Sequence, residues 1–314
     1  MPTLSRVLAQ NKALLGLVVL IVAVSIASPN FLEVGNLFNV LRQTSINAVI
    51  AMGGTFVILT AGIDLSVGAV LALCGAFAAS LVAGGYGLMS MLPLVLAAGT
   101  VLGALSGLVI TFGGVQPFIA TLVSMTILRG AVLVYSNGTP IDSSGGPASD
   151  ALGSFGEGYF LGVPIPVIVA AIVFVCCWVA LTQTRFGRYV YAIGGNENVT
   201  RLSGVNVTLV KISVYAVSGL LAALAGVILT ARLESAQPTA GLGYELDAIA
   251  AVVVGGTSLA GGIGTMFGTL VGALIIGVLN NALNLLDVSS YYQQIAKGCV
   301  ILLAVLADRQ GRSN

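Results

Sequence analysis

The sequence lacks histidine entirely, and it holds few charged residues of either sign. Without histidine, the chain has no side chain whose unperturbed pKa lies near neutrality, and it lacks the commonest metal ligand. Charged residues are 7% of the total, whereas soluble domains carry about 25%. A surface with so few charges cannot be kept in water, so most of it must face lipid or other protein. We therefore predict an integral membrane protein.

Other missing features exclude whole classes of function. The formal net charge is only +1, so no basic field favours a nucleic-acid partner. None of the lysines completes a GxxxxGK[ST] phosphate loop, so we do not expect the chain to hydrolyse ATP itself. No CxxC pair occurs, and we predict no disulfide framework, metal site or cofactor. The four cysteines lie in apolar runs and are expected to be buried small hydrophobic residues: Cys74, Cys176, Cys177 and Cys299.

What is present is a series of apolar runs. A helix needs about 20 apolar residues to cross the hydrocarbon of a bilayer. The runs predict an all-α fold, a polytopic membrane helix bundle of about ten transmembrane helices that forms a single transmembrane domain over residues 1–314. The spans are expected near Leu14–Ala27, Ser45–Thr60, Val67–Ala83, Met91–Phe112, Phe118–Tyr135, Pro164–Leu181, Ile212–Thr230, Ala248–Leu259, Phe267–Leu286 and Tyr292–Leu306. The first and eighth runs are short.

Basic residues in the loops predict the orientation. An even number of spans places both termini on the side that carries most of the lysines and arginines, which is the cytoplasmic side. Two longer polar segments lie on opposite sides of the predicted membrane. Residues 136–163, whose charges are all acidic, form the expected periplasmic loop. Residues 182–211 form a basic cytoplasmic loop with a short predicted helix near Glu197–Ser203, for which Asn196 is the expected N-cap.

Small residues recur in two patterns. Glycines at four-residue spacing, at positions 99, 103 and 107 and again at 264, 268 and 272, indicate close helix packing. The segment Leu59–Gly68 (LTAGIDLSVG) aligns with Leu259–Gly268 (LAGGIGTMFG), and both are expected at cytoplasmic turns. We interpret the pair as a candidate internal repeat, with chance as the alternative in a chain so rich in glycine, alanine and leucine. Transporters often handle substrate where such repeats meet.

Ionisable groups at membrane depth are costly and indicate function by default. Here each also has a structural alternative: Asp64 could cap the third helix, and Arg129 could pair with a carboxylate such as Glu245. The centres of the spans are nearly uncharged, which argues against proton or sodium coupling and favours a neutral polar solute. The residues expected to line or gate the path are Asn47, Asp64, Gln116, Arg129, Glu245 and Asp247.

Long strings of the sequence carry a resemblance to a known family. They include VILTAGIDLSVGAVLAL, QPFIATLVSMTILRG and TRFGRYVYAIGGNENVTRLSGVNV, and the similarity runs from about Asn30 to Asp308. The chain resembles the permease subunits of bacterial ABC sugar importers of the ribose, xylose, arabinose and galactose group, and most of all their ribose members. The resemblance implies a non-catalytic subunit that moves a monosaccharide, with ribose as the first expectation, across the bacterial inner membrane.

The same resemblance implies the partners. A second permease copy would complete a homodimer, a cytoplasmic ABC ATPase would supply energy, and a periplasmic sugar-binding protein would deliver the sugar. The cytoplasmic loop would dock into the ATPase through a coupling helix, whose motif is matched by Asn196, Glu197, Arg201 and Gly204. The basic loop could instead serve only as a positive-inside anchor. The alternative function is a stand-alone secondary transporter or channel for small neutral solutes, while an intramembrane enzyme is disfavoured by the missing histidine.

Overall fold

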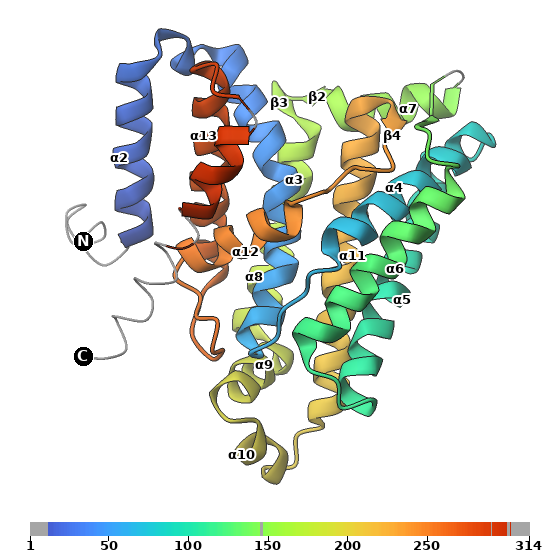
Figure 1. Ribbon diagram of the computed structural model, residues 1–314, viewed down its shortest axis with the longest axis vertical. Coiled ribbons are helices and arrows are strands. Elements are labelled where there is room, and N and C mark those ends of the chain that lie inside the picture. The colour runs from blue at the N-terminus through green and yellow to red at the C-terminus, as the bar shows by residue number, and fades with distance from the viewer. Residues whose placement is uncertain (1–11, 145–146, 290, 300–301, 303–314) are drawn as a thin grey trace.

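A computed structural model describes residues 12–144, 147–289, 291–299 and 302 of the chain. Most of these residues are helical (Figure 1). The helices are α2 (Lys12–Ala27), η1 (Pro29–Leu32), α3 (Val34–Leu59), α4 (Val67–Ala83), α5 (Leu88–Phe112), α6 (Pro117–Tyr135), α7 (Pro147–Glu157), α8 (Ile165–Gln183), α9 (Arg185–Gly195), α10 (Glu197–Leu202), α11 (Val207–Leu233), α12 (Tyr244–Val254) and α13 (Met266–Leu285). Residues 291–299 are also helical. The prediction of an all-α polytopic membrane protein is confirmed.

Five of the described helices, α5, α6, α8, α11 and α13, are long and apolar enough to cross a membrane, and α2 and α4 are shorter apolar helices. The strands are two residues long and pair in twos. β1 (Ile141–Asp142) is antiparallel to β4 (Ser235–Ala236), and β2 (Tyr159–Phe160) is antiparallel to β3 (Val163–Pro164). They lie with α7 at one end of the bundle, whereas α9 and α10 lie at the other end (Figure 1).

The predicted eighth span, Ala248–Leu259, is not a full crossing. The helix there is α12, whose 11 residues cover about 16 Å at 1.5 Å per residue, roughly half of a hydrocarbon core about 30 Å thick. It ends at Gly255 and Gly256, and Gly256 adopts a left-handed φ of 90° that no helix continues. The end of the last predicted span, residues 300, 301 and 303–306, lies outside the described residues, as do both termini.

Helix α11 forms the centre of the bundle. It packs tightly against α5 because the glycine stripe Gly99, Gly103 and Gly107 faces it, and a Cβ at Gly103 would overlap the carbonyl of Tyr215. The close packing predicted from this stripe is therefore confirmed. The second stripe differs at its start, since Gly264 precedes α13, while Gly268 and Gly272 pack on the backbone of α12.

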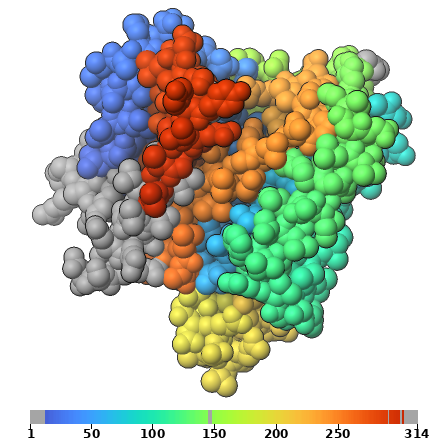
Figure 2. Space-filling view, viewed as in Figure 1, coloured from blue at the N-terminus to red at the C-terminus, as the bar shows by residue number. Residues whose placement is uncertain are grey.

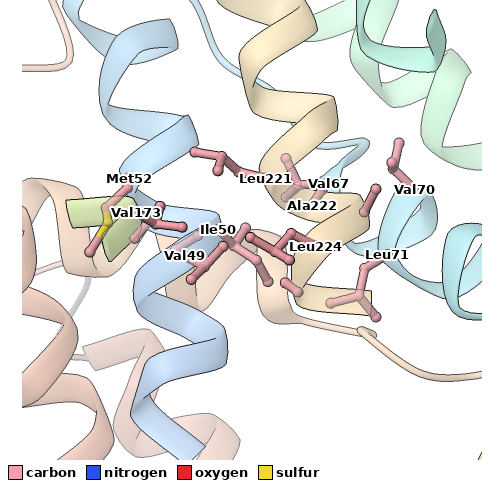
Figure 3. Close-up of a cluster of buried hydrophobic side chains, with 14 of the residues drawn as sticks. Val49, Ile50, Met52, Val67, Val70, Leu71, Val173, Leu221, Ala222 and Leu224 are labelled. Atoms are coloured by element: carbon pink, nitrogen blue, oxygen red, sulfur yellow. The ribbon is translucent and has the colours of Figure 1, made fainter. Parts of the chain in front are cut away.

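The largest hydrophobic cluster joins α3, α4, α8 and α11. Figure 3 shows its centre, where side chains of α3, α4 and α11 converge and Val173 of α8 approaches from one side.

The four cysteines differ in their exposure. Cys74 and Cys177 are buried, but Cys176 and Cys299 are exposed, so the prediction of buried thiols is wrong for these two. An apolar helix in a membrane also presents side chains to lipid, and composition alone does not distinguish its two faces.

Candidate functional site

Two helices start inside the bundle and not at its end. The link 60–66 leads from α3 to α4, and a second link of equal length, 237–243, leads from β4 to α12. Figure 1 shows the second link crossing the bundle toward α12 and the first rising from the bottom of α3 to α4. Interrupted helices of this kind place backbone polar groups and helix N-termini within the membrane, where transporters bind their substrates.

The two interrupted helices meet at Gly68 and Gly241. A Cβ at Gly68 would overlap the Gly241 carbonyl oxygen and lie 2.6 Å from Glu245 Oε2. Gly241 itself has a φ of 70°, in the left-handed region that favours glycine. We call this contact the helix crossing: Gly68 at the start of α4, Gly241 in the link before α12, and Glu245 in the first turn of α12.

Asp64 lies beside the crossing and is 6% exposed. Its Oδ1 accepts hydrogen bonds from the Ser66 backbone N–H at 3.0 Å and from the Ser66 hydroxyl at 2.6 Å, and its Oδ2 accepts from Ser218 Oγ of α11 at 2.7 Å. The carboxylate thus closes a turn immediately before α4 and ties that turn to α11. The N-cap of α4 is Ser66 and not Asp64, so the expectation that Asp64 caps this helix is wrong. Tyr215 and Thr121 fix the same link by donating to the Ile63 carbonyl.

Arg129 of α6 stabilises the link that precedes α12. Its Nη1 donates to the carbonyls of Pro238 at 3.2 Å and Ala240 at 2.7 Å. Glu245 is near enough to interact with the guanidinium electrostatically, but within the described part of the chain the two form no direct ion pair. The predicted Arg129–carboxylate pair is therefore replaced by a clamp on backbone carbonyls, which the sequence could not indicate.

The carboxylates of α12 have different environments. Glu245 Oε1 accepts from the Gly243 N–H at 3.3 Å, and Oε2 is buried with no hydrogen-bond partner among the described residues. Asp247 is 4% exposed, and its Oδ2 forms an ion pair of 2.9 Å with Lys297 Nζ, which joins α12 to the helical segment 291–299. Acidic groups in the first turn are favoured by the positive end of the helix dipole.

A small cavity of about 10 Å³ lies at the crossing, which is about the space of one water molecule. It is lined by Ile50, Gly54, Ile58, Asp64, Val67, Glu245, Ala248 and Ile249. A monosaccharide cannot enter a space of this size. The crossing is closed in this conformation, so any passage of solute there requires α4 and α12 to move apart.

The other predicted path residues lie away from this cavity. Asn47 is buried in α3, and its Oδ1 has no partner among the described residues. Gln116 is exposed at the N-terminus of α6 and makes no capping hydrogen bond. Sequence reasoning missed Gly68, Gly241 and Ser218. The aligned segments Leu59–Gly68 and Leu259–Gly268 gave a partial signal, because Gly68 closes the first of them.

The predicted coupling residues build α10. Asn196 caps it by accepting from the Val199 N–H at 3.0 Å, and Gly204 follows it with a φ of 83°. Glu197 forms ion pairs with Arg201 and Lys211. Partial burial alone would raise the pKa of Glu197, but the hydrogen bonds and charges of these two cations outweigh it and lower the pKa.

The exposed surface of α10 includes two apolar side chains beside the polar Asn198 and Arg201. Val199 is 57% exposed and Leu202 is 88% exposed. The helix projects with α9 as a knob at one end of the molecule (Figure 2). Exposed apolar side chains on a projecting helix indicate an interaction surface. The residues named from the sequence include the exposed Arg201, but not Val199 or Leu202.

The sequence of this chain is similar to those of several known permease proteins. The family described as branched-chain amino acid transport system / permease component matches residues 36–305. The ribose import permease protein RbsC of Haemophilus influenzae is 58% identical over 305 residues, covering 97% of this chain and 94% of that protein. The RbsC of Bacillus subtilis is 57% identical, covering 94% and 91%. The D-allose transport system permease protein AlsC of Escherichia coli is 42% identical, covering 91% and 86%. No solved structure matches the chain.

Proposed function

The chain belongs to the family of branched-chain amino acid transport system / permease components, and from this premise we propose that it is the membrane-spanning subunit of an ATP-driven monosaccharide importer. The observation that carries the proposal is the high identity to ribose import permeases over nearly the whole chain. We propose ribose as the sugar. The nearly uncharged spans suit a neutral polyol better than an ion.

The energy source in this proposal is a separate ABC ATPase that docks on α10 in the cytoplasm. The chain lacks a phosphate loop of its own, which leaves ATP binding to a partner. Val199 and Leu202 would insert into an apolar recess of the ATPase, while Asn196, Glu197, Arg201 and Gly204 hold α10 in shape. The exposure of the two apolar side chains supports this division of roles.

The remaining partners are proposed on the same basis: a second permease copy and a periplasmic sugar-binding protein at the bacterial inner membrane. The charges of the two ends support an orientation with α9 and α10 in the cytoplasm. The basic residues Arg185, Arg188, Arg201 and Lys211 lie at that end. The exposed carboxylates of Asp142, Asp150, Glu157 and Glu234 lie in or beside the segments at the opposite end. A basic inner end is the pattern that membrane insertion favours.

The sugar path is proposed to pass the helix crossing. Asp64 and Glu245 would offer carboxylate oxygens to sugar hydroxyls once α4 and α12 separate, and Arg129 would hold the link of α12 in place during that movement. Asp247, Asn47 and Gln116 are proposed to act away from the crossing, in gating or at the ends of the path. The unpartnered Oε2 of Glu245 supports the role of this residue.

Uptake of labelled ribose tests the function. Cells without the chain should lose ATP-dependent ribose uptake, and a plasmid copy should restore it. Unlabelled ribose should compete better than allose or xylose. Unchanged uptake in a strain with no redundant system would refute the proposal. Purified chain in liposomes without any ATPase should move no sugar, and transport under an ion gradient there would instead establish a stand-alone transporter.

A further inference from the structure

The backbone of helix α9 directly contacts two segments, the end of α3 and the loop between α12 and α13. A Cβ at Gly194 would overlap the Leu59 carbonyl oxygen at the end of α3 and the Gly262 N–H in the loop between α12 and α13. The Gly262 N–H donates to the same Leu59 carbonyl at 2.9 Å. Gly261 and Gly262, with φ of 85° and 74°, bring their backbone against Gly194 and Gly195. Three chain segments therefore meet with no side chain between them.

Side chains of α9 add two further links, one to the loop between α12 and α13 and one to α3. The Tyr191 hydroxyl donates to the Gly264 carbonyl at 2.8 Å. The ring of Phe186 packs on Phe56 near the end of α3, with 5.8 Å between the ring centroids. A backbone contact reinforced in this way has few soft degrees of freedom, so a displacement of α9 must displace the neighbouring loops as well.

Both loops lead directly to the helix crossing. Leu59 ends α3 and immediately precedes the link 60–66, which carries Asp64 and ends at the start of α4. The loop with Gly261 and Gly262 follows α12, whose other end carries Glu245. Helix α9 thus contacts the segments next to one end of the link 60–66 and one end of α12. The opposite ends of that link and of α12 lie at the helix crossing, near Gly68 and Gly241.

We propose that Gly194 and Tyr191 are positioning residues that transmit movement of the cytoplasmic α9–α10 knob to the helix crossing. The inference rests on the proposed function, since the docked ATPase supplies the movement. Gly194 allows the backbone contact that makes the transmission rigid, and Tyr191 holds the loop after α12 to α9. Neither residue touches the sugar or the exposed face of α10.

The matched pair Gly194→Ala and Gly195→Ala tests the inference. The substitutions are chemically identical and adjacent, but a Cβ at Gly195 has nothing within 4 Å. Each variant is purified with the cognate ATPase, and backbone hydrogen exchange is followed when a non-hydrolysable ATP analogue is added. With G195A, as in the unmodified complex, exchange should change both in residues 185–204 and in residues 60–66. With G194A the change should persist in 185–204 and fall at least threefold in 60–66.

Transport provides the second readout. G194A should bind the ATPase normally yet move at least tenfold less sugar per ATP hydrolysed than G195A. Should G194A fail to accumulate in membranes, Tyr191→Phe carries the test, because it removes one hydroxyl and leaves the volume unchanged. An unchanged exchange response and an unchanged sugar-to-ATP ratio in G194A, or in Y191F where G194A is unavailable, would overturn the inference. Failure of the unmodified chain to bind an ATPase would instead refute the proposed function.

Discussion

Replacing Gly68 by alanine tests the geometry of the helix crossing. The added Cβ would overlap the Gly241 carbonyl and lie 2.6 Å from Glu245 Oε2, whereas real Cβ atoms essentially never come within 3.0 Å of a neighbour. The Glu245 carboxylate is the end of a flexible side chain and can rotate away. The Gly241 carbonyl is backbone in a link that Arg129 clamps, so α4 and the link must separate.

The magnitude follows from the type of contact. Forcing an extra carbon into a packed interior typically costs about 1–3 kcal/mol, which corresponds to about a 5- to 150-fold shift in a conformational equilibrium. We expect G68A to lower the thermal stability of the purified protein and to reduce ribose uptake at least about fivefold. Stability is measured by thermal unfolding in detergent, and uptake by the labelled-sugar assay, normalised to the amount of chain in the membrane.

Gly54→Ala is the matched control because it lines the same cavity. A Cβ there would have its nearest neighbour, a methyl of Val252, at 3.9 Å, an ordinary contact. G54A should therefore keep its thermal stability and at least half of its uptake. If G68A equals G54A in both measurements, the two backbones are not held together as described, and the crossing is not a site where α4 and α12 are coupled.

Three further predictions concern other parts of the molecule. Val199→Asp and Leu202→Asp should each weaken ATPase copurification at least tenfold, because they replace the two exposed apolar side chains of α10 by charge; normal copurification of both would contradict the docking proposal. Because its folded-state pKa is lowered, Glu197 stabilises α10 above the ordinary carboxyl pKa, and this contribution is lost as pH falls through the lower folded value. Exchange protection of residues 197–202 should therefore fall with acid, and pH-independent protection that E197Q leaves unchanged would refute this. Asp247→Ala should destabilise the protein by about 3–5 kcal/mol by leaving Lys297 unpaired, and D247A/K297M should recover part of the loss in thermal unfolding; no difference between the single and double variants would show that the pair is not coupled.

Much of the fold could be predicted from the sequence because membrane helices obey a strong local rule. Backbone groups in lipid must be satisfied within the segment, so long apolar runs fold as helices whatever their neighbours are. The runs that became α5, α8 and α11 were predicted within a few residues. The same rule failed for α12, because this apolar run packs against other helices of the bundle. Such a run can leave the helical conformation at glycines such as Gly255 and Gly256.

The candidate site was less predictable, because its residues are joined by tertiary contacts. The sequence showed that Asp64 and Glu245 are unusual at membrane depth, but not that they line one cavity. Arg129 was expected to seek a carboxylate, and only the path of the link 237–243 supplied carbonyls in its place. For α10 the capping pattern at Asn196 was correct, yet the direction in which Val199 and Leu202 face depends on how α10 packs on its neighbours.

By itself, the sequence indicated that this chain is a helical membrane protein, that it has no GxxxxGK[ST] motif, and that it belongs with sugar permeases. These conclusions depend on composition, local periodicity and long matching strings, which are all properties of contiguous residues. The tertiary structure decided where helices are interrupted, that Gly68 meets Gly241, and that Gly194 joins α9 to two distant loops. Such contacts depend on backbone distances between segments that are remote in sequence. A glycine in the sequence does not by itself show which other segment packs against its backbone.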